Sequence, residues 1–225
     1  MPITRRDLSL GAAAALLSGC VSPPNDAAGP SRSTSPALRA AANPGFDAWV
    51  TGFRARAAGR GISQATLSAA FRGVGFLPGV IERDRNQTEN VRSLEDYLNI
   101  ATSDERLSQG RVALRQYGSV LQQIEARYGV APHVVAAIWG LESRFGQRRG
   151  DIPVISALST LAYDGRRGAF FESQLLAALR ILQRGDISPA KMTGSWAGAM
   201  GHTQFIPTLF EAYAVDFNGD GRRDI

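Results

Sequence analysis

The chain lacks the features that define several other classes of protein. It has one cysteine, Cys20, among 225 residues, so an intrachain disulfide is impossible. It has no internal repeat and no long alternation of apolar and polar residues, which argues against extended β-strands. Its net charge of +5 comes almost entirely from arginine. These arginines do not cluster with aromatic residues, so we expect no nucleic-acid partner.

Apolar residues recur at helical spacing along most of the chain, and a content of 44% hydrophobic residues suffices for the core of one or two domains. Ser63 and Ser103 are suitable N-caps, Gly129 is suited to end a helix, and Pro132 suits a first helical turn. We therefore expect a mainly α fold, with helices over residues 46–58, 64–71, 88–100, 104–128, 132–142, 154–162, 169–182 and 207–215.

The N-terminus has the pattern of an export signal. Two arginines at positions 5 and 6 precede an apolar stretch over residues 8–17, which is too short to span a bilayer, and Cys20 follows Ser-Gly. We expect residues 1–20 to be a lipoprotein signal peptide. Acylated Cys20 would then anchor the protein to the periplasmic face of the outer membrane of a Gram-negative bacterium. Both the general secretory and the twin-arginine route stay open, and an ordinary signal peptide with a chance cysteine is the alternative.

Residues 21–45 are rich in Pro, Ser, Ala and Gly, a composition typical of flexible linkers. We expect them to tether the folded body to the lipid.

The most informative segment, residues 136–146, places one carboxylate, Glu142, at the end of an apolar helical run. Apolar neighbours disfavour a carboxylate anion and so favour the protonated acid. A protonated carboxyl is what a general acid needs at a glycosidic bond. The alternative is an ordinary surface glutamate at a helix end. The expected apolar face of this helix consists of Val134, Val135, Ile138 and Leu141.

Two further segments combine glycines with polar side chains. In residues 194–207, small residues allow another backbone or a ligand to approach closely, and Ser195 and Gln204 offer hydrogen bonds beside them. A loop that only packs against a helix is the alternative. In residues 164–171, Arg166 and Arg167 lie in a glycine-flanked turn and are suited to bind carboxylates. An exposed basic turn is the alternative there.

Residues 216–224 match the first part of an EF-hand loop. Glycine stands at loop position 6, and oxygen ligands stand at positions 1, 3, 5, 7 and 9. We expect a structural calcium ion here, bound weakly because position 12 falls beyond Ile225. A metal-free turn rich in Asp and Gly is the alternative. The expected ligands are Asp216, Asn218, Asp220, Asp224 and the backbone carbonyl of Arg222.

In their order and spacing these motifs resemble those of the lytic murein transglycosylases of the membrane-bound B type, from about residue 46 to the end and most densely over 128–225. The resemblance implies a lysozyme-like catalytic core over residues 129–225 with an EF-hand-like calcium loop. It also implies an N-terminal α-helical region over 46–128. Members of the family are longer, so the resemblance implies that these residues are an N-terminal portion with an incomplete core.

The resemblance also implies roles for individual residues. Glu142 takes the catalytic place, with peptidoglycan glycan strands as the partner. At His202 and Thr203 the chain departs from the family, which often has Tyr-Gly there, so a sugar contact at this point is in doubt. The residues implied to bind the glycan are Ser195, Gln204, Arg166, Arg167 and Tyr97.

Most glycosidases use two carboxylates, whereas only Glu142 has a suitable setting here. Asp151 lies in a glycine-bounded loop that gives it no fixed position. We therefore expect the acetamido group of N-acetylmuramic acid to act as nucleophile and the product to carry a 1,6-anhydro end. A goose-type-lysozyme-like hydrolase, a non-catalytic peptidoglycan-binding lipoprotein and a calcium-responsive adaptor are the alternatives.

Overall fold

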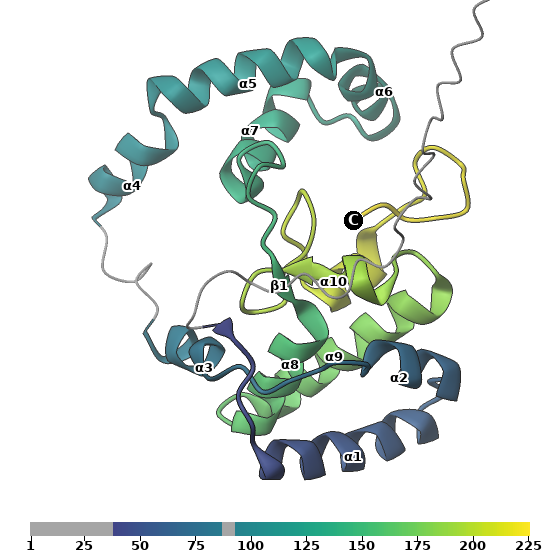
Figure 1. Ribbon diagram of the computed structural model, residues 1–225. Helices are drawn as coiled ribbons and strands as arrows, with labels where there is room; N and C mark the ends of the chain where they lie inside the picture. The colour runs from purple at the N-terminus through teal and green to yellow at the C-terminus, as the bar shows by residue number, and fades with distance from the viewer. Residues whose placement is uncertain (1–37, 87–92) are drawn as a thin grey trace, which may run out of the picture.

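The computed structural model describes residues 38–86 and 93–225 (Figure 1). The expected signal peptide, Cys20 and the expected tether as far as residue 37 lie outside the described residues, as do residues 87–92. Within the described ranges, no helix combines the length and the apolar character that crossing a bilayer requires.

The described chain is mainly helical, as expected. The only sheet among the described residues pairs β1 (Ile152–Pro153) with β2 (Thr193–Gly194) in antiparallel register, and a 3₁₀ turn, η3 (Pro189–Lys191), precedes β2. The α-helices are α1 (Pro44–Gly59), α2 (Gln64–Ala70), α3 (Pro78–Arg85), α4 (Leu94–Ala101), α5 (Asp104–Gln116), α6 (Gly118–Tyr128), α7 (Pro132–Ser143), α8 (Val154–Asp164), α9 (Gly168–Arg184) and α10 (Pro207–Tyr213).

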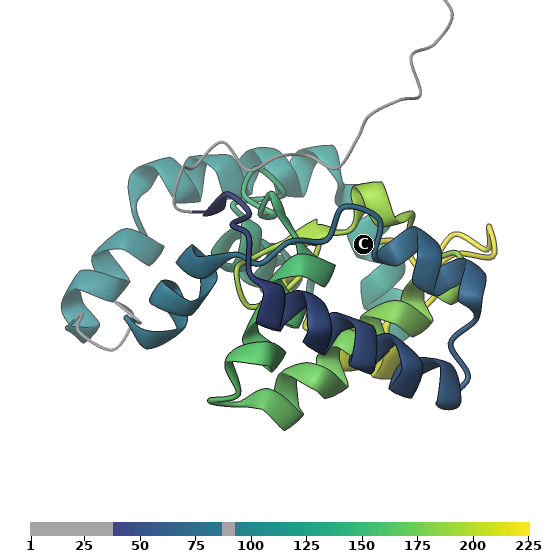
Figure 2. The same cartoon turned by 60° about the horizontal axis from the view of Figure 1, so that its bottom comes forward.

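Helix α8 lies at the centre of the core. Every residue from Val154 to Ala162 is buried, because α3, α1 and α9 all pack against this helix. Figure 2 shows α1 running across α8 and α9 on one side of the molecule. Buried hydroxyls need hydrogen-bond partners. Ser156 Oγ accepts from the backbone N–H of Gly75, and Thr160 Oγ1 accepts from that of Leu77, at 3.3 and 3.1 Å.

The helices α4 to α6 form an arc above this core, and α7 packs against α5 and α6 (Figure 1). From the end of α7 the chain runs back through β1 into α8. Helices α1 and α3 pack against α8, and α2 packs against α9, so contacts cross residue 128. The expected division into residues 46–128 and 129–225 stays a prediction.

Ordered structure begins before residue 46. Leu38 is buried, and the backbone N–H of Ala41 donates to the carbonyl of Phe76 at 2.8 Å. Helix α1 then starts at Pro44, where the side chain of Asn43 accepts from the N–H of Phe46. The expected tether is thus shorter at its C-terminal end than the composition indicated.

The expected helix 104–128 is wrong, because it is two helices that meet at Tyr117. Glycine at 118 has a low helix propensity, and the ring of Tyr117 packs edge-on against Trp139 with ring centroids 5.1 Å apart. Ser103 makes no side-chain cap bond, whereas Ser63 accepts from the N–H of Thr66 as expected. Gly129 ends α6 in the left-handed conformation, with φ of 70°.

Candidate active site

Glu142 is the penultimate residue of α7 and is exposed. The helix ends abruptly after Ser143, because Arg144 and Phe145 both take left-handed backbone angles, with φ of 49° and 55°. This conformation is strained for any residue with a Cβ, so neighbouring contacts must hold it. Arg144 Nη2 pairs with Glu105 of α5 at 3.3 Å, which is one such contact.

The ring of Phe145 supplies the second contact at this helix end. It lies so close to α7 that a Cβ at Gly140 would come within 2.6 Å of the ring, and one at Gly110 of α5 within 3.3 Å. Glycine at these two positions is therefore what allows the ring to fold back between α5 and α7. The edge of Trp139, with ring centroids 5.6 Å away, completes its surroundings.

The glycine-rich loop over residues 194–206 docks against the same helix end. Ser143 Oγ donates to the backbone carbonyl of His202 at 2.8 Å, and Trp139 Nε1 donates to His202 Nδ1 at 2.8 Å. A Cβ at Gly146 would lie 2.4 Å from the His202 ring. The structure thus brings together two of the segments that the sequence singled out, and it does so through residues on both sides of Glu142.

Ser195 and Gln204 hold this loop in shape. The hydroxyl oxygen of Ser195 accepts from the N–H of Ala199 at 3.1 Å. Gln204 Nε2 donates to the carbonyls of Gly201 and Arg149, both at 3.0 Å, from a backbone with φ of 50°. These side chains therefore have a structural task, and their expected contact with the saccharide stays a prediction.

The expected apolar face of α7 is exposed rather than buried, which corrects the sequence-based prediction. Val134, Ile138 and Leu141 are 41%, 50% and 45% exposed. The residues that α7 buries are Ala136, Gly140 and Ser143. The helix uses its small residues for close packing, and its large apolar side chains flank Glu142 on the outer surface.

The carboxylate of Glu142 has no protein partner in the part of the chain that the structure describes. Among residues 38–86 and 93–225, no hydrogen bond or ion pair to this carboxylate is found, and the closest cation in sequence, Arg144, is engaged by Glu105. The other titratable group at this helix end, His202, has a lowered pKa. Burial disfavours its charged form, and the positive charge of Arg149 adds to the effect.

Arg166 and Arg167 bind a carboxylate of the protein itself. Arg166 Nε and Arg167 Nη2 donate to the two oxygens of Asp84, each at 2.6 Å, and the side chain of Asp84 is only 1% exposed. The pair thus fastens α3 to the turn between α8 and α9. Sequence reasoning missed Asp84, since nothing near it in the chain marks it as the partner. The expected contact of the arginines with the glycan stays a prediction.

Tyr97 lies on α4 and is 50% exposed. In the part of the chain that the structure describes, no contact is found that joins it to the end of α7. Its expected place in the glycan site also stays a prediction.

The loop over residues 216–224 has a turn built around Asp216. Asp216 Oδ1 accepts from the N–H of Gly219 at 2.7 Å, and its Oδ2 accepts from the N–H of Gly221 at 2.8 Å. No three His, Cys, Asp or Glu side chains converge anywhere in the described ranges, so the expected carboxylates do not form a complete cluster. The oxygen donors of the expected set, three carboxylates with an amide and a backbone carbonyl, are of the kind that calcium prefers, and the site stays a prediction.

The positive charge of Arg223, within this loop, is neutralised by Asp186. Arg223 Nε donates to Asp186 Oδ2 at 3.1 Å, and the arginine is nearly buried. Burial by itself would raise the pKa of Asp186, but the hydrogen bonds and charge of Arg223 outweigh it, so this pKa lies below its ordinary value.

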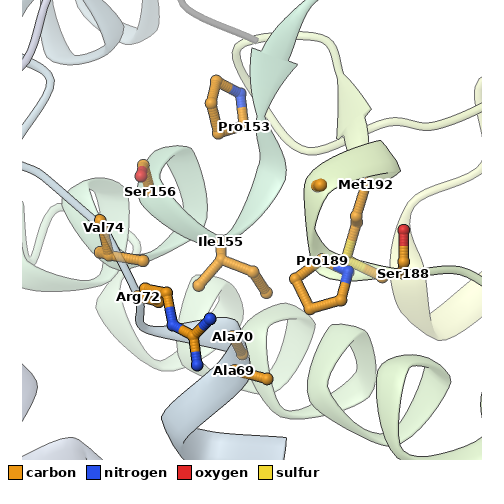
Figure 3. Close-up of a pocket in the computed structure, with 12 residues that line it drawn as sticks. Ala69, Ala70, Arg72, Val74, Pro153, Ile155, Ser156, Ser188, Pro189 and Met192 are labelled. Atoms are coloured by element: carbon orange, nitrogen blue, oxygen red, sulfur yellow. The ribbon is translucent and has the colours of Figure 1, made fainter. Parts of the chain in front are cut away.

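A pocket of about 320 Å³ lies away from this site, between the turn after α2, the start of α8 and η3 (Figure 3). Its walls are mainly apolar, and among the described residues that line it Arg72 alone is charged. It contains none of the candidate residues.

A carboxylate at the end of a helix, faced by a glycine-rich loop in a mainly helical body, defines a lysozyme-like enzyme domain. Residues 45–225 match the family model described as "Transglycosylase SLT domain", and the chain belongs to this family.

Individual relatives agree with this assignment. The chain is 36% identical to the membrane-bound lytic murein transglycosylase B of Escherichia coli over 118 residues. This matched stretch covers 52% of this chain and 33% of the E. coli protein. SltB3 of Pseudomonas aeruginosa, solved in complex with NAG-anhNAM-pentapeptide, superposes with a TM-score of 0.78 at 50% identity, over 80% of this chain and 48% of that one. The E. coli lytic transglycosylase Slt35 in complex with calcium superposes with a TM-score of 0.69 at 29% identity, over 81% of this chain and 57% of that one. The chain thus spans 48% and 57% of these two solved relatives and 33% of the curated one.

Proposed function

We propose that the protein is a peptidoglycan lytic transglycosylase that cleaves the β-1,4 bond between N-acetylmuramic acid and N-acetylglucosamine and leaves 1,6-anhydro ends. The observation that carries the proposal is the exposed carboxylate of Glu142, which has no hydrogen-bond or ion-pair partner among the described residues and lies at a helix end that the loop 194–206 holds in place. Family membership supports the same class of reaction, and the ligand of the SltB3 structure carries an anhydro sugar in its name.

In the proposed reaction Glu142 first acts as general acid and protonates the leaving glycosidic oxygen. The acetamido oxygen of the same muramic acid attacks C1 and forms an oxazolinium ion, so no second carboxylate is needed. Glu142, now a carboxylate, takes the proton of the C6 hydroxyl, whose oxygen attacks C1 and displaces the acetamido oxygen. This intramolecular attack outcompetes water because the hydroxyl is held at high effective concentration.

Contacts of the protein support a one-carboxylate mechanism. Glu105, the carboxylate tied to this helix end, is paired with Arg144 at 3.3 Å, and the proposal gives it a structural role and no part in the reaction. Ser195 accepts a hydrogen bond from Ala199, so its own hydroxyl hydrogen is left to donate to the acetamido group. Gln204 and Tyr97 are proposed as further glycan contacts.

The arginine turn is proposed to face the peptide side of the substrate. Arg166 and Arg167 share the single carboxylate of Asp84, so the cluster keeps a net positive charge, and the two side chains are 47% and 41% exposed. Such a cluster attracts an anionic group even though its geometry is already fixed.

Two finer features complete the proposal. Asp216, Asn218, Asp220, Asp224 and the carbonyl of Arg222 would hold a calcium ion whose role is to stiffen the loop beside α10. Acylated Cys20 would attach the protein to the periplasmic face of the outer membrane, in keeping with the membrane-bound relative. Metabolic labelling with palmitate tests the anchor, since label retained by the variant C20A would refute it.

The decisive experiment compares the wild type with E142Q on purified sacculi and identifies the ends of the released muropeptides by mass spectrometry. We expect anhydro ends from the wild type and a loss of turnover of roughly 10²-fold or more in E142Q, with binding to sacculi retained. Free reducing ends would identify a hydrolase instead. Binding without any release would identify a non-catalytic wall-binding protein.

A further inference from the structure

We propose that His202 is a positioning residue of the catalytic helix end. Its neutral ring accepts the indole hydrogen of Trp139, and this contact, here called the lock, holds the loop 194–206 against α7. Protonation of the ring breaks the contact and so opens the lock. The inference rests on the proposed function of Glu142, but its structural part is tested separately from catalysis.

The geometry of the lock has three parts. Trp139 Nε1 donates to His202 Nδ1 at 2.8 Å, and Ser143 Oγ donates to the backbone carbonyl of His202 at 2.8 Å. The absence of a side chain at Gly146 leaves room for the imidazole. Trp139 and Ser143 lie one turn apart on α7, and Glu142 stands between them, so a shift of His202 is transmitted to the segment that carries the carboxylate.

The indole decides which form of the histidine fits. An indole N–H is a donor only, so Nδ1 must carry a lone pair, and in neutral imidazole the hydrogen then sits on Nε2. The imidazolium ion has hydrogens on both nitrogens and cannot accept from Trp139. Protonation would therefore set two N–H groups against each other and leave the indole without its acceptor.

The charges around the ring favour the neutral form. From the turn before β1 come Arg148 and Arg149, of which Arg149 lowers the pKa of His202 together with burial. Helix α7 and its end contribute Glu142, whose negative charge acts in the opposite direction, and Arg144, which is paired with Glu105 of α5. The lock is thus closed at neutral pH and opens as the pH falls below the ordinary histidine value of about 6.5.

Two variants separate the loss of the hydrogen-bond acceptor for Trp139 from the protonation of residue 202. In H202N the amide oxygen occupies the place of Nδ1, so the acceptor is kept but cannot be protonated. In H202Q the amide oxygen reaches the place of Nε2 instead, so Trp139 loses its acceptor at any pH. The two changes are otherwise closely matched in polarity and size.

The first measurement is the tryptophan fluorescence of the full chain as a function of pH. Protonation changes both the charge of the His202 ring and its contact with Trp139, so we expect the fluorescence of this tryptophan in the wild type to change, with a midpoint below about pH 6.5. The variant W139F serves as the control that removes the reporter. A transition of the same size in H202N or in W139F would overturn the proposal.

The second measurement is kcat and KM on peptidoglycan fragments across pH. We expect kcat of H202Q to fall roughly 10-fold at neutral pH with little change in KM, since a small misplacement of a catalytic group lowers the rate by up to about 10²-fold. H202N should stay close to the wild type at neutral pH and should lose less activity on acidification. Equal kcat values for H202Q and wild type would overturn the positioning role while leaving the proposed function intact. Full activity of E142Q would refute the proposed function without deciding the fluorescence result.

Discussion

The buried carboxylate of Asp84 allows the sharpest test of how this fold is held together. Two guanidinium groups donate to it, each at 2.6 Å, and its side chain is 1% exposed. The variant D84N keeps the shape but removes the charge and turns one acceptor oxygen into a donor that faces an arginine. One charge-assisted hydrogen bond is lost and the other is weakened because its acceptor becomes neutral; each is worth about 1.5–3 kcal/mol in the wild type. Because the arginines are 47% and 41% exposed and regain water, we take about half of that sum.

The expected loss is therefore about 1.5–3 kcal/mol in the free energy of unfolding, or roughly 3–12 °C in melting temperature for a chain of this size. Urea denaturation followed by circular dichroism measures it. The matched control is E172Q, which breaks the ion pair of Glu172 with Arg56 at 3.0 Å between side chains that are 23% and 45% exposed. That pair should contribute no more than about 1 kcal/mol. Equal losses in the two variants would refute the view that burial of Asp84 makes this contact strong.

Two further predictions concern glycine packing and the metal loop. G140A should destabilise the protein by about 1–3 kcal/mol, because the new methyl would lie 2.6 Å from the ring of Phe145, whereas G59A meets no atom within 4 Å and should have little effect in the same urea titration. Calcium should raise the melting temperature of the wild type but not that of D216N; a rise of equal size in both would exclude the loop as the binding site.

Local signals in the sequence were sufficient for most helices. Ser63 as a cap, Gly129 as a terminator and Pro132 in a first turn act within a few residues of their own position, so their roles can be inferred without knowledge of the fold. The break between α5 and α6 at Tyr117 could not be predicted from the sequence, because part of its cause is the ring of Trp139, which the fold brings in from α7.

The candidate site was predictable in outline and not in its contacts. The segments around Glu142 and Gln204 were found from their composition, yet the bond that joins them runs from Trp139 to His202, 63 residues further on. Periodicity indicated an apolar face on α7 but could not say that small residues would face the neighbouring helix. The partner of Arg166 and Arg167 lies more than 80 residues earlier, at Asp84, in a stretch with no distinguishing pattern.

The left-handed turn at Arg144 and Phe145 that ends α7, here called the corner, has a consequence for how the protein responds to heat. The corner is held from outside, by the ion pair to Glu105 and by a ring wedged against α5, so the direction in which Glu142 projects depends on a helix that begins nearly forty residues earlier. Fraying of α5 would relax the corner while the core around α8 is still intact. Turnover should then decline at temperatures at which the far-ultraviolet spectrum still reports a folded protein.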